Sequence, residues 1–398
     1  MASLKKIRSW LTAAQQAIQL PWSNMRQSVS QTDTVELPLE QFQKLRQIIQ
    51  ALPPPPGHVA AVRTALKDAV EAWRTYDNAP NALVVLTEPT ETAVEILEQA
   101  IQTDELPFSL KTHYIDSWQS RPDDYLSIQE HLCQAVGQIY HQSDSAETIS
   151  LGLIPCLDHY FLRCVDGLEA IEVLRNAVVE RTDCFWLIGC NHWAWQFLDR
   201  ICYLEAYLEK TMALPQIQPQ QVKHWLYELI SAIEIEPFET DPDADAKVSE
   251  DWDSAAEKAF FHDIVDTAAG IAHVAAYVWL NSLSYELNDP DVDQPSADSV
   301  EPLGRVKRSQ VKLPKLPSLD AADRYLLYAI LLHGSLSSQH LMQSLAEPAG
   351  RVQAQLQKLK RQDVVEQYRS GWRVNPSYYL SLKKHLMRNN FLVGDPDA

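Results

Sequence analysis

The chain has 398 residues, which is more than one hydrophobic core usually supports, so two or three domains are expected. Hydrophobic residues make up 46% and charged residues 22%, as in soluble globular proteins, and no apolar run reaches the ~18–20 residues of a bilayer-spanning helix. The six cysteines form no CxxC pair, which excludes a zinc ribbon or disulfide framework and predicts reduced thiols in a cytoplasmic protein.

Charge is distributed unevenly along the chain, whose net charge is −19. Residues 303–398 contain 15 Lys and Arg against 7 Asp and Glu, whereas residues 1–302 contain 19 against 46. The acidic part is a poor candidate for binding nucleic acid through phosphate neutralisation, while the basic part is compatible with it. The same distribution fits two parts of one protein that neutralise each other, so charge alone specifies no partner.

The first 75 residues are expected to form an N-terminal helical extension. Residues 4–20 repeat apolar side chains at helical spacing beside three basic ones, which predicts an amphipathic helix. Such a helix packs on its own domain, docks on a partner or makes weak contact with an anionic membrane surface, and all three alternatives stay open. The PPPPG sequence at 53–57 predicts a stiff break before a second helix that ends near Trp73.

Short apolar runs alternate with longer helical patterns over residues 76–215. Continuous apolar runs separated by helices are typical of parallel strands that are buried on both faces. The expected strands are ALVVL at 82–86, LKTHYID at 110–116, ISLGLI at 149–154, CFWLIGC at 184–190 and TMAL at 211–214. The sequence therefore predicts an α/β core over residues 76–215, a helical lid over residues 216–286 and a disordered linker over residues 287–318.

The first strand, turn and helix of this core lie where a phosphate-binding loop would be expected. A loop of the form GxxxxGK[ST] needs glycines so that backbone N–H groups can close on phosphate, a lysine for charge, and a hydroxyl for Mg²⁺. Here Thr87 and Thr92 occupy the glycine positions, Ala93 the lysine position and Val94 the hydroxyl position. Glu88, inside the loop, would repel phosphate, so the sequence predicts a degenerate nucleotide site.

Two later strands place polar residues at the same edge of the predicted sheet. The third strand is followed by Pro155 and Cys156 where a metal-holding acidic pair would be needed, and Asp158 comes two residues later. The fourth strand ends at Asn191, and a polar residue at the tip of a central strand lies where a γ-phosphate sensor would be expected.

These strands and helices, over residues 81–286, resemble an AAA+ P-loop ATPase domain with its helical lid. The motif FWLIGCNHWAWQFLDR at 185–200 is similar to the sensor strand of a bacterial AAA-type ATPase-like family that carries a C-terminal winged helix. The resemblance implies that Asn191 matches the sensor asparagine and that His273 stands where a lid GxxR sequence has its arginine. With the losses at the loop, it implies an AAA+-like core that is retained for its shape and needs no nucleotide cofactor.

Residues 319–398 are expected to form a winged helix-turn-helix domain. Helical patterns at 320–333, 337–345 and 350–362 are followed by two short strands around a Ser370-Gly371 turn and a last helix from Pro376. The residues expected to contact DNA or an acidic partner are Arg351, Gln353, Gln355, Lys358 and Arg361 on the third helix and Arg369 and Arg373 on the wing. A winged helix also serves as a protein-docking module, and that alternative stays open.

No metal site or nucleophile is predicted. His262, Asp263 and Asp266 stand at one-turn spacing but lack an upstream pair of ligands, and no GxSxG sequence occurs. Two functional hypotheses follow. The first is a non-catalytic regulatory or scaffolding protein that binds a protein partner and docks on DNA or protein through its basic domain. The alternative is an ATP-dependent AAA+ type switch that uses an unorthodox or partner-supplied nucleotide site.

Overall fold

The chain forms two compact units in the computed structural model. Unit 1 comprises Met1–Pro53 and Gln216–Pro314, and unit 2 comprises Pro54–Pro215 and Lys315–Ala398. The residues that the structure describes are 34–102, 106–115, 121, 122, 124, 126–140, 148–231, 233, 235–241, 245, 248, 249, 251–287 and 304–391. The amphipathic helix predicted at 4–20 lies outside them. No helix among them is long and apolar enough to cross a membrane.

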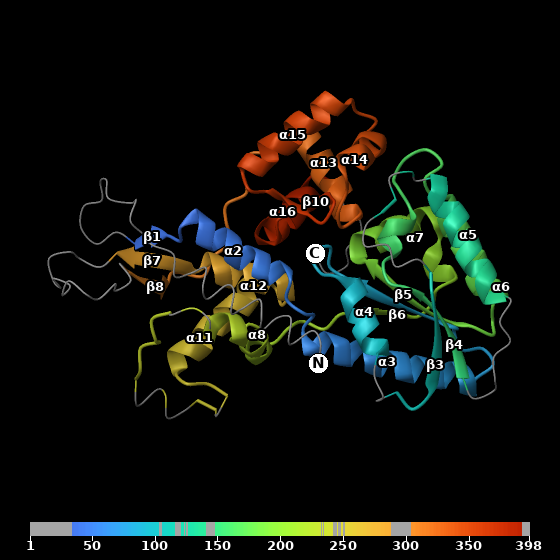
Figure 1. The fold of residues 1–398 in the computed structure, drawn as a ribbon, viewed down its shortest axis with the longest axis horizontal. Helices are drawn as coiled ribbons and strands as arrows, with labels where there is room; N and C mark the ends of the chain where they lie inside the picture. Colours follow the sequence, from blue (N-terminus) through green and yellow to red (C-terminus); the bar gives the residue numbers. More distant parts are fainter. Residues whose placement is uncertain are drawn as a thin grey trace, which may run out of the picture. The chain divides into compact units, whose positions relative to one another are not determined.

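Unit 2 is built on a five-stranded parallel sheet with the strand order β3-β4-β5-β2-β6 (Figure 1). The strands are β2 (Ala82–Thr87), β3 (Ser109–Tyr114), β4 (Thr148–Ile154), β5 (Phe185–Asn191) and β6 (Thr211–Ala213). The α/β fold class and all five predicted strands are confirmed. Their ends differ from the predicted ends by up to two residues, because apolar runs mark the buried part of a strand and not its last hydrogen bond.

Helices cover both faces of this sheet. They are α3 (Pro56–Thr75), α4 (Ala93–Ile101), α5 (Leu126–Tyr140), α6 (Glu169–Glu180) and α7 (His192–Cys202), with short 3-10 turns at Leu157–Tyr160 and Leu204–Ala206. Val62 and Leu66 of α3 and Leu97 of α4 pack with Leu83 and Phe185 of the sheet in one fully buried cluster. The helix at 56–75 is therefore part of the α/β core, whereas the sequence placed it in an N-terminal extension. Its apolar face needs the sheet to bury it.

The turn after β4 lies against β5, and a glycine makes this close approach possible. A Cβ atom at Gly189 would lie 2.3 Å from the carbonyl oxygen of Pro155 and 2.9 Å from the Cβ of Ala93. The absence of a side chain lets the backbone after β4, the tip of β5 and the start of α4 meet at one edge of the sheet. This edge is formed by the carboxyl ends of the strands.

Unit 1 combines helices with a small antiparallel sheet. The helices are α2 (Leu39–Gln50), α8 (Pro219–Trp225), α9 (Tyr227–Ser231), α11 (Ala255–Thr267) and α12 (Ala272–Asn281), and the strands β1 (Thr34–Glu36), β7 (Leu283–Leu287) and β8 (Gly304–Arg308) pair in the order β1-β7-β8. Strand β8 lies within the segment predicted to be a disordered linker. This strand is ordered because its five residues pair with β7. The composition of the segment, from which the linker was predicted, carries no information about pairing with a distant strand.

The C-terminal module, residues 315–391, contains three helices, a two-stranded antiparallel ribbon and a fourth helix, in the order predicted from the sequence. These are α13 (Ala321–Leu332), α14 (Ser338–Leu345), α15 (Ala349–Arg361), β9 (Val365–Tyr368), β10 (Gly371–Val374) and α16 (Pro376–Arg388). Asp320 begins α13 with a capping box, because its side chain accepts from the Asp323 N–H while Asp323 accepts from the Asp320 N–H. The module belongs to the same compact unit as the α/β core.

Candidate docking interface at the strand ends

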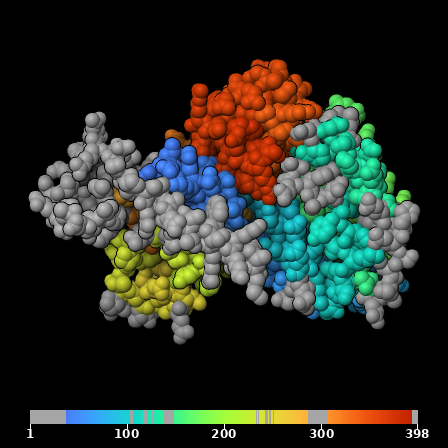
Figure 2. All heavy atoms as spheres, viewed as in Figure 1, coloured from blue at the N-terminus to red at the C-terminus, as the bar shows by residue number. Residues whose placement is uncertain are grey.

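The carboxyl ends of the parallel strands carry the polar residues that the sequence singled out. In open α/β sheets this edge is the usual place for a ligand. Thr87 and Asn191 are register partners at the ends of β2 and β5, and Asp158 follows β4 in a 3-10 turn. All three residues are buried. The C-terminal module covers this edge, and Figure 2 shows it in red against the cyan part of the core.

Asn191 makes hydrogen bonds with both the core and the module. Its backbone N–H donates to Asp158 Oδ1 and its Nδ2 donates to Asp158 Oδ2, each at 2.9 Å. Nδ2 also lies 3.3 Å from the carbonyl oxygen of Leu331 and 3.1 Å from that of Leu332, in the last turn of α13. Its Oδ1 accepts from the Ala194 N–H at 2.8 Å and so caps α7. Every polar atom of this side chain is used within the protein.

Asp158 is a buried carboxylate held by hydrogen bonds. Burial raises the pKa of Asp158 above its ordinary value, while hydrogen bonds from Asn191 and from the Cys190 thiol oppose the rise. The Arg121 guanidinium nearby also lowers the pKa of Asp158, by a smaller effect. Both carboxylate oxygens of Asp158 accept hydrogen bonds from Asn191 at the end of β5. Among the described residues, no group of three His, Cys, Asp or Glu could hold a metal ion.

A second contact joins the loop after β2 to α16. The Tyr379 hydroxyl donates to the carboxylate of Glu88, and the indole Nε1–H of Trp193 donates to the same hydroxyl at 3.0 Å. Burial and the charge of Glu88 raise the pKa of Tyr379 well above its ordinary value. Lys383 Nζ lies 3.8 Å from Glu88 Oε1. Glu88 was expected to repel phosphate, and here it binds the module instead.

A third contact is an ion pair at the rim. Arg369, in the turn between β9 and β10, lies with Nη2 2.6 Å from Oε1 of Glu95 in the first turn of α4. Both side chains keep about a third of their surface exposed. The wing arginine is therefore directed at the core of its own chain.

A fourth contact buries two histidines of the module against the core. His333, which ends α13, lies with Nδ1 3.0 Å from Nη2 of Arg121, and its Nε2 accepts from the backbone N–H of Arg163 at 3.2 Å. Its ring centroid is 4.6 Å from that of Phe161. His340 of α14 lies with Nε2 2.8 Å from the carbonyl oxygen of Pro122. We call the interface between the C-terminal module and the strand ends the dock. It combines hydrogen bonds, ion pairs and aromatic packing.

The structure brings together some of the predicted nucleotide-site positions. Thr92 precedes α4 without a side-chain cap, Ala93 is buried at the start of that helix, and Val94 follows half-buried. His273 does not belong to this group, because it lies in α12 of unit 1. There it is 5% exposed and its ring meets the Trp225 ring edge-on, with the centroids 5.6 Å apart.

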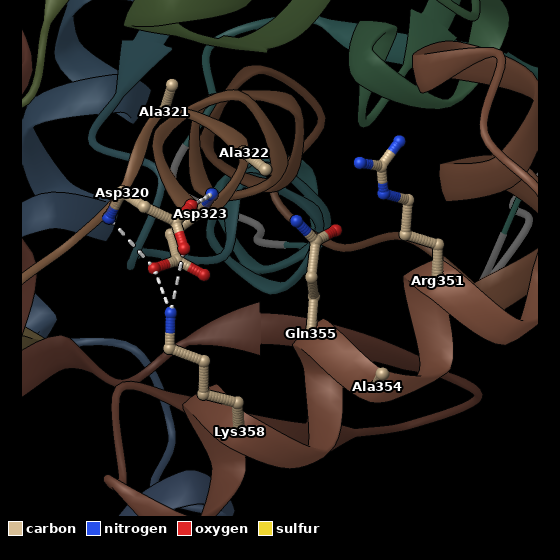
Figure 3. A pocket seen from close by; sticks show the side chains of 8 residues that line it. All are labelled: Asp320, Ala321, Ala322, Asp323, Arg351, Ala354, Gln355 and Lys358. Carbon is tan, nitrogen blue, oxygen red and sulfur yellow. Dashed lines mark hydrogen bonds and ion pairs between the residues drawn. The ribbon is translucent and has the colours of Figure 1, made fainter.

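Most of the basic residues predicted to bind DNA or a partner are paired within the chain. Arg351 is exposed but bonds both oxygens of Glu347 at 3.1 Å, and Lys358 Nζ lies 3.0 Å from Asp320 and 2.6 Å from Asp323 (Figure 3). An open pocket of about 500 Å³ is lined by Asp320, Ala321, Ala322, Asp323, Arg351, Ala354, Gln355 and Lys358.

The wing differs from the prediction. Arg373 is 4% exposed, bonds Glu366 Oε1 at 2.6 Å and stacks 3.9 Å from the Tyr368 ring centroid, so it stabilises the ribbon from within. The sequence suggested a contact with DNA, but in the structure Arg373 is buried opposite Glu366, its register partner across the ribbon. Gln353 and Arg361 remain on the exposed face of α15.

Sequence reasoning did not find Glu88, Arg121, His333 and Tyr379 as contact residues. Tyr379 and Glu88 are separated by 291 positions and Arg121 and His333 by 212. Hydrophobic periodicity reports which face of a helix is buried but not what covers it. The one available signal was His333, a polar residue directly after the apolar run ILL at 330–332.

No protein-family model and no curated protein sequence matches the chain. Among solved structures, RuvB of Thermotoga maritima is 14% identical with a TM-score of 0.30, covering 84% of this chain and 95% of RuvB. The ORC2 protein of Aeropyrum pernix is 10% identical with a TM-score of 0.35, covering 85% and 96%. PCH-2 of C. elegans is 15% identical with a TM-score of 0.35, covering 64% and 70%. These proteins are AAA+ P-loop ATPases. Similarity at this level carries no argument about this chain, and the α/β fold class rests on the sheet itself.

Proposed function

We propose that this protein is a non-catalytic scaffold in which an ATPase-like core holds its C-terminal module in place of a nucleotide. The observation that carries this proposal is the use of Asn191. At the tip of a central strand its amide would be free to meet a phosphate, but its hydrogens have acceptors in Asp158 and in the last turn of α13. Glu88, in the loop after β2, binds Tyr379 of α16.

The chemistry of the loop supports the same conclusion. Phosphoryl transfer depends on positioning and charge stabilisation by several groups together, including a lysine, a metal ligand and loop N–H groups. The loop here offers Thr87, Thr92, Ala93 and Val94 at those positions. Glu91, close by, lies with Oε1 3.9 Å from Nδ1 of the buried His58. The loop itself contributes two carboxylates, Glu88 and Glu91, and no Lys or Arg, which opposes the binding of a nucleotide.

The partner that fits the module is a protein in preference to DNA. DNA affinity depends largely on the number of phosphates that Lys and Arg neutralise. In the module, Arg369 pairs with Glu95, Arg373 with Glu366, and Lys358 with Asp320 and Asp323. Few of the predicted contact residues would reach a phosphate without breaking an ion pair. Weak contact of residues 4–20 with a membrane surface stays a separate proposal.

ATPase and DNA-binding assays on the full chain test this function. We expect no Mg²⁺-dependent ATP hydrolysis from the wild type. None is expected either from Glu95→Arg, in which loss of the ion pair with Arg369 should expose a site hidden by the module a few-fold more often. We also expect no anisotropy change of labelled duplex DNA at about 150 mM salt, where counterion competition is strong. Hydrolysis by Glu95→Arg alone would identify a switch with a masked nucleotide site and contradict the proposal. DNA binding that Arg351→Ala and Arg361→Ala abolish would overturn the choice of a protein partner.

A further inference from the structure

His333 is placed between two hydrogen-bond donors of the core. It is 1% exposed at the end of α13. Nη2 of Arg121 lies 3.0 Å from its Nδ1, and the backbone N–H of Arg163 points at its Nε2 at 3.2 Å. A guanidinium and an amide N–H can only donate, so both contacts need the imidazole nitrogen to accept.

The protonation state of the ring decides how well these contacts are satisfied. A neutral imidazole has one N–H and one acceptor, so it satisfies one of the two donors. An imidazolium has two N–H groups and no acceptor, so it satisfies neither. Its positive charge would also lie directly beside the Arg121 guanidinium in a site without solvent. Docking of the module therefore favours the neutral form of His333.

The groups around His333 are mostly cationic. They include the Arg121 and Arg163 side chains and the ring of His340, which lower the pKa of His333, while a hydrogen bond to the Asp158 backbone raises it by less than burial and Arg121 lower it. The buried Asp158 carboxyl acts electrostatically on Arg121. The Cys156 and Cys164 thiols also lie close to Arg121. Burial lowers the pKa of Arg121 to about 10, and its Nε and Nη1 have no hydrogen-bond partner among the residues that the structure describes. A buried polar cluster with unsatisfied donors contributes little net stability and is sensitive to a further charge.

We propose that His333 is a proton-sensitive latch, and that protonation of its imidazole releases the C-terminal module from the strand ends. This inference goes beyond the scaffold function and does not depend on whether a nucleotide binds. Release would free Asn191, Glu88 and Glu95 for another partner while the chain stays continuous through residues 309–319. Two prolines in that segment, Pro314 and Pro317, limit how far it collapses.

The sign of the effect follows from linkage. Burial, then the Arg121 charge, hold the pKa of docked His333 well below its ordinary value of 6.5. A group with a depressed pKa in the docked state stabilises docking above the undocked pKa, and this contribution decreases as pH falls below about 6.5. One such histidine increases the opening constant about tenfold between pH 7.5 and pH 5.5. Asp158, whose pKa burial raises, acts in the opposite direction, because the docked state binds its proton more tightly.

Hydrogen exchange of the full chain, followed by mass spectrometry and corrected for the intrinsic pH dependence of exchange, measures this opening. Peptides that cover residues 187–195 and 325–334 report the dock, and a peptide within α15 reports the folding of the module itself. We expect exchange in the dock peptides to rise about tenfold from pH 7.5 to pH 5.5 while α15 stays protected. Unchanged protection of the dock peptides across this range would overturn the proposal.

Three variants assign the effect to His333. His333→Gln keeps an acceptor but cannot titrate, so its dock peptides should exchange with no acid-dependent rise. His333→Arg carries a permanent charge and should expose the dock peptides at pH 7.5, as acid does in the wild type. His385→Gln, a change of the same kind on α16 away from the dock, should keep the wild-type response. The proposal is wrong if His333→Gln retains the full rise, if His333→Arg stays as protected as the wild type, or if His340→Gln abolishes the rise instead.

Discussion

Glu95 and Arg369 form an ion pair, with 2.6 Å between Oε1 and Nη2, across 274 positions of sequence. Glu95 lies in the first turn of α4, directly after the loop that would hold phosphate in a nucleotide-binding protein. Arg369 lies at the tip of the β9–β10 ribbon, where a winged helix would contact DNA. One residue beside the expected nucleotide site and one at the expected DNA-contacting tip thus bind each other. Exchanging their charges tests this ion pair.

Charge reversal at either residue should weaken the dock, and reversal at both should restore it. Because each side chain is about one-third exposed, we expect a coupling energy of only about 0.5–1 kcal/mol. Urea unfolding of Glu95→Arg, Arg369→Glu and the double variant gives this coupling as a double-mutant cycle. A double variant that is less stable than both single variants would contradict the pairing.

Removal of one hydroxyl should destabilise unit 2 more than its size suggests. Tyr379→Phe leaves the buried Trp193 Nε1–H without its acceptor and removes the hydroxyl that donates to the partly exposed Glu88. We expect a loss of about 1–3 kcal/mol in the free energy of unfolding. Tyr325→Phe on α13, where the tyrosine is 51% exposed, is the matched control and should change stability by less than about 0.5 kcal/mol. Equal effects of the two changes would show that the buried hydroxyl is not engaged.

Asn191→Ala should be among the most destabilising polar substitutions in the chain. It removes the cap of α7, the bond to Asp158 Oδ2 and the contacts to the last turn of α13. The combined loss should be about 2–4 kcal/mol by urea unfolding. Asn176→Ala, on the exposed face of α6, serves as the control and should leave stability unchanged or slightly higher. A small effect at Asn191 would mean that its amide is available to a ligand.

The cysteines should differ widely in their reaction with iodoacetamide at pH 8. Burial raises the pKa of Cys184 to about 11 and those of Cys156 and Cys190 well above the ordinary value, so these thiols remain protonated. Cys133 is exposed on α5 and should be alkylated first. Peptide mapping after timed alkylation measures the order. Fast labelling of Cys190 in the folded chain would contradict the packing of β5 beside Asp158.

The sequence was informative where one segment determines its own structure. The runs ALVVL and CFWLIGC became β2 and β5 because buried parallel strands are apolar throughout, and Asp320 began α13 because a short carboxylate caps a helix. Asn191 and Asp158 were singled out correctly as positions at one sheet edge. What covers that edge was not predictable, because the contacts of Tyr379 and His333 depend on how distant elements pack. The burial of Arg373 was missed for the same reason, since residue type does not report its pairing with Glu366 across the ribbon.

The most direct test of the account is isothermal titration of the full chain with Mg²⁺-ATP and Mg²⁺-ADP, supported by the melting temperature at about 1 mM nucleotide. A core whose strand ends are occupied by Asn191, Glu88 and Tyr379 should give no saturable heat and no shift of the melting temperature. Saturable binding with a Kd near 10 μM would stabilise the protein by about 2.7 kcal/mol at about 100 times that concentration. That result would contradict the claim that the C-terminal module stands in place of a nucleotide.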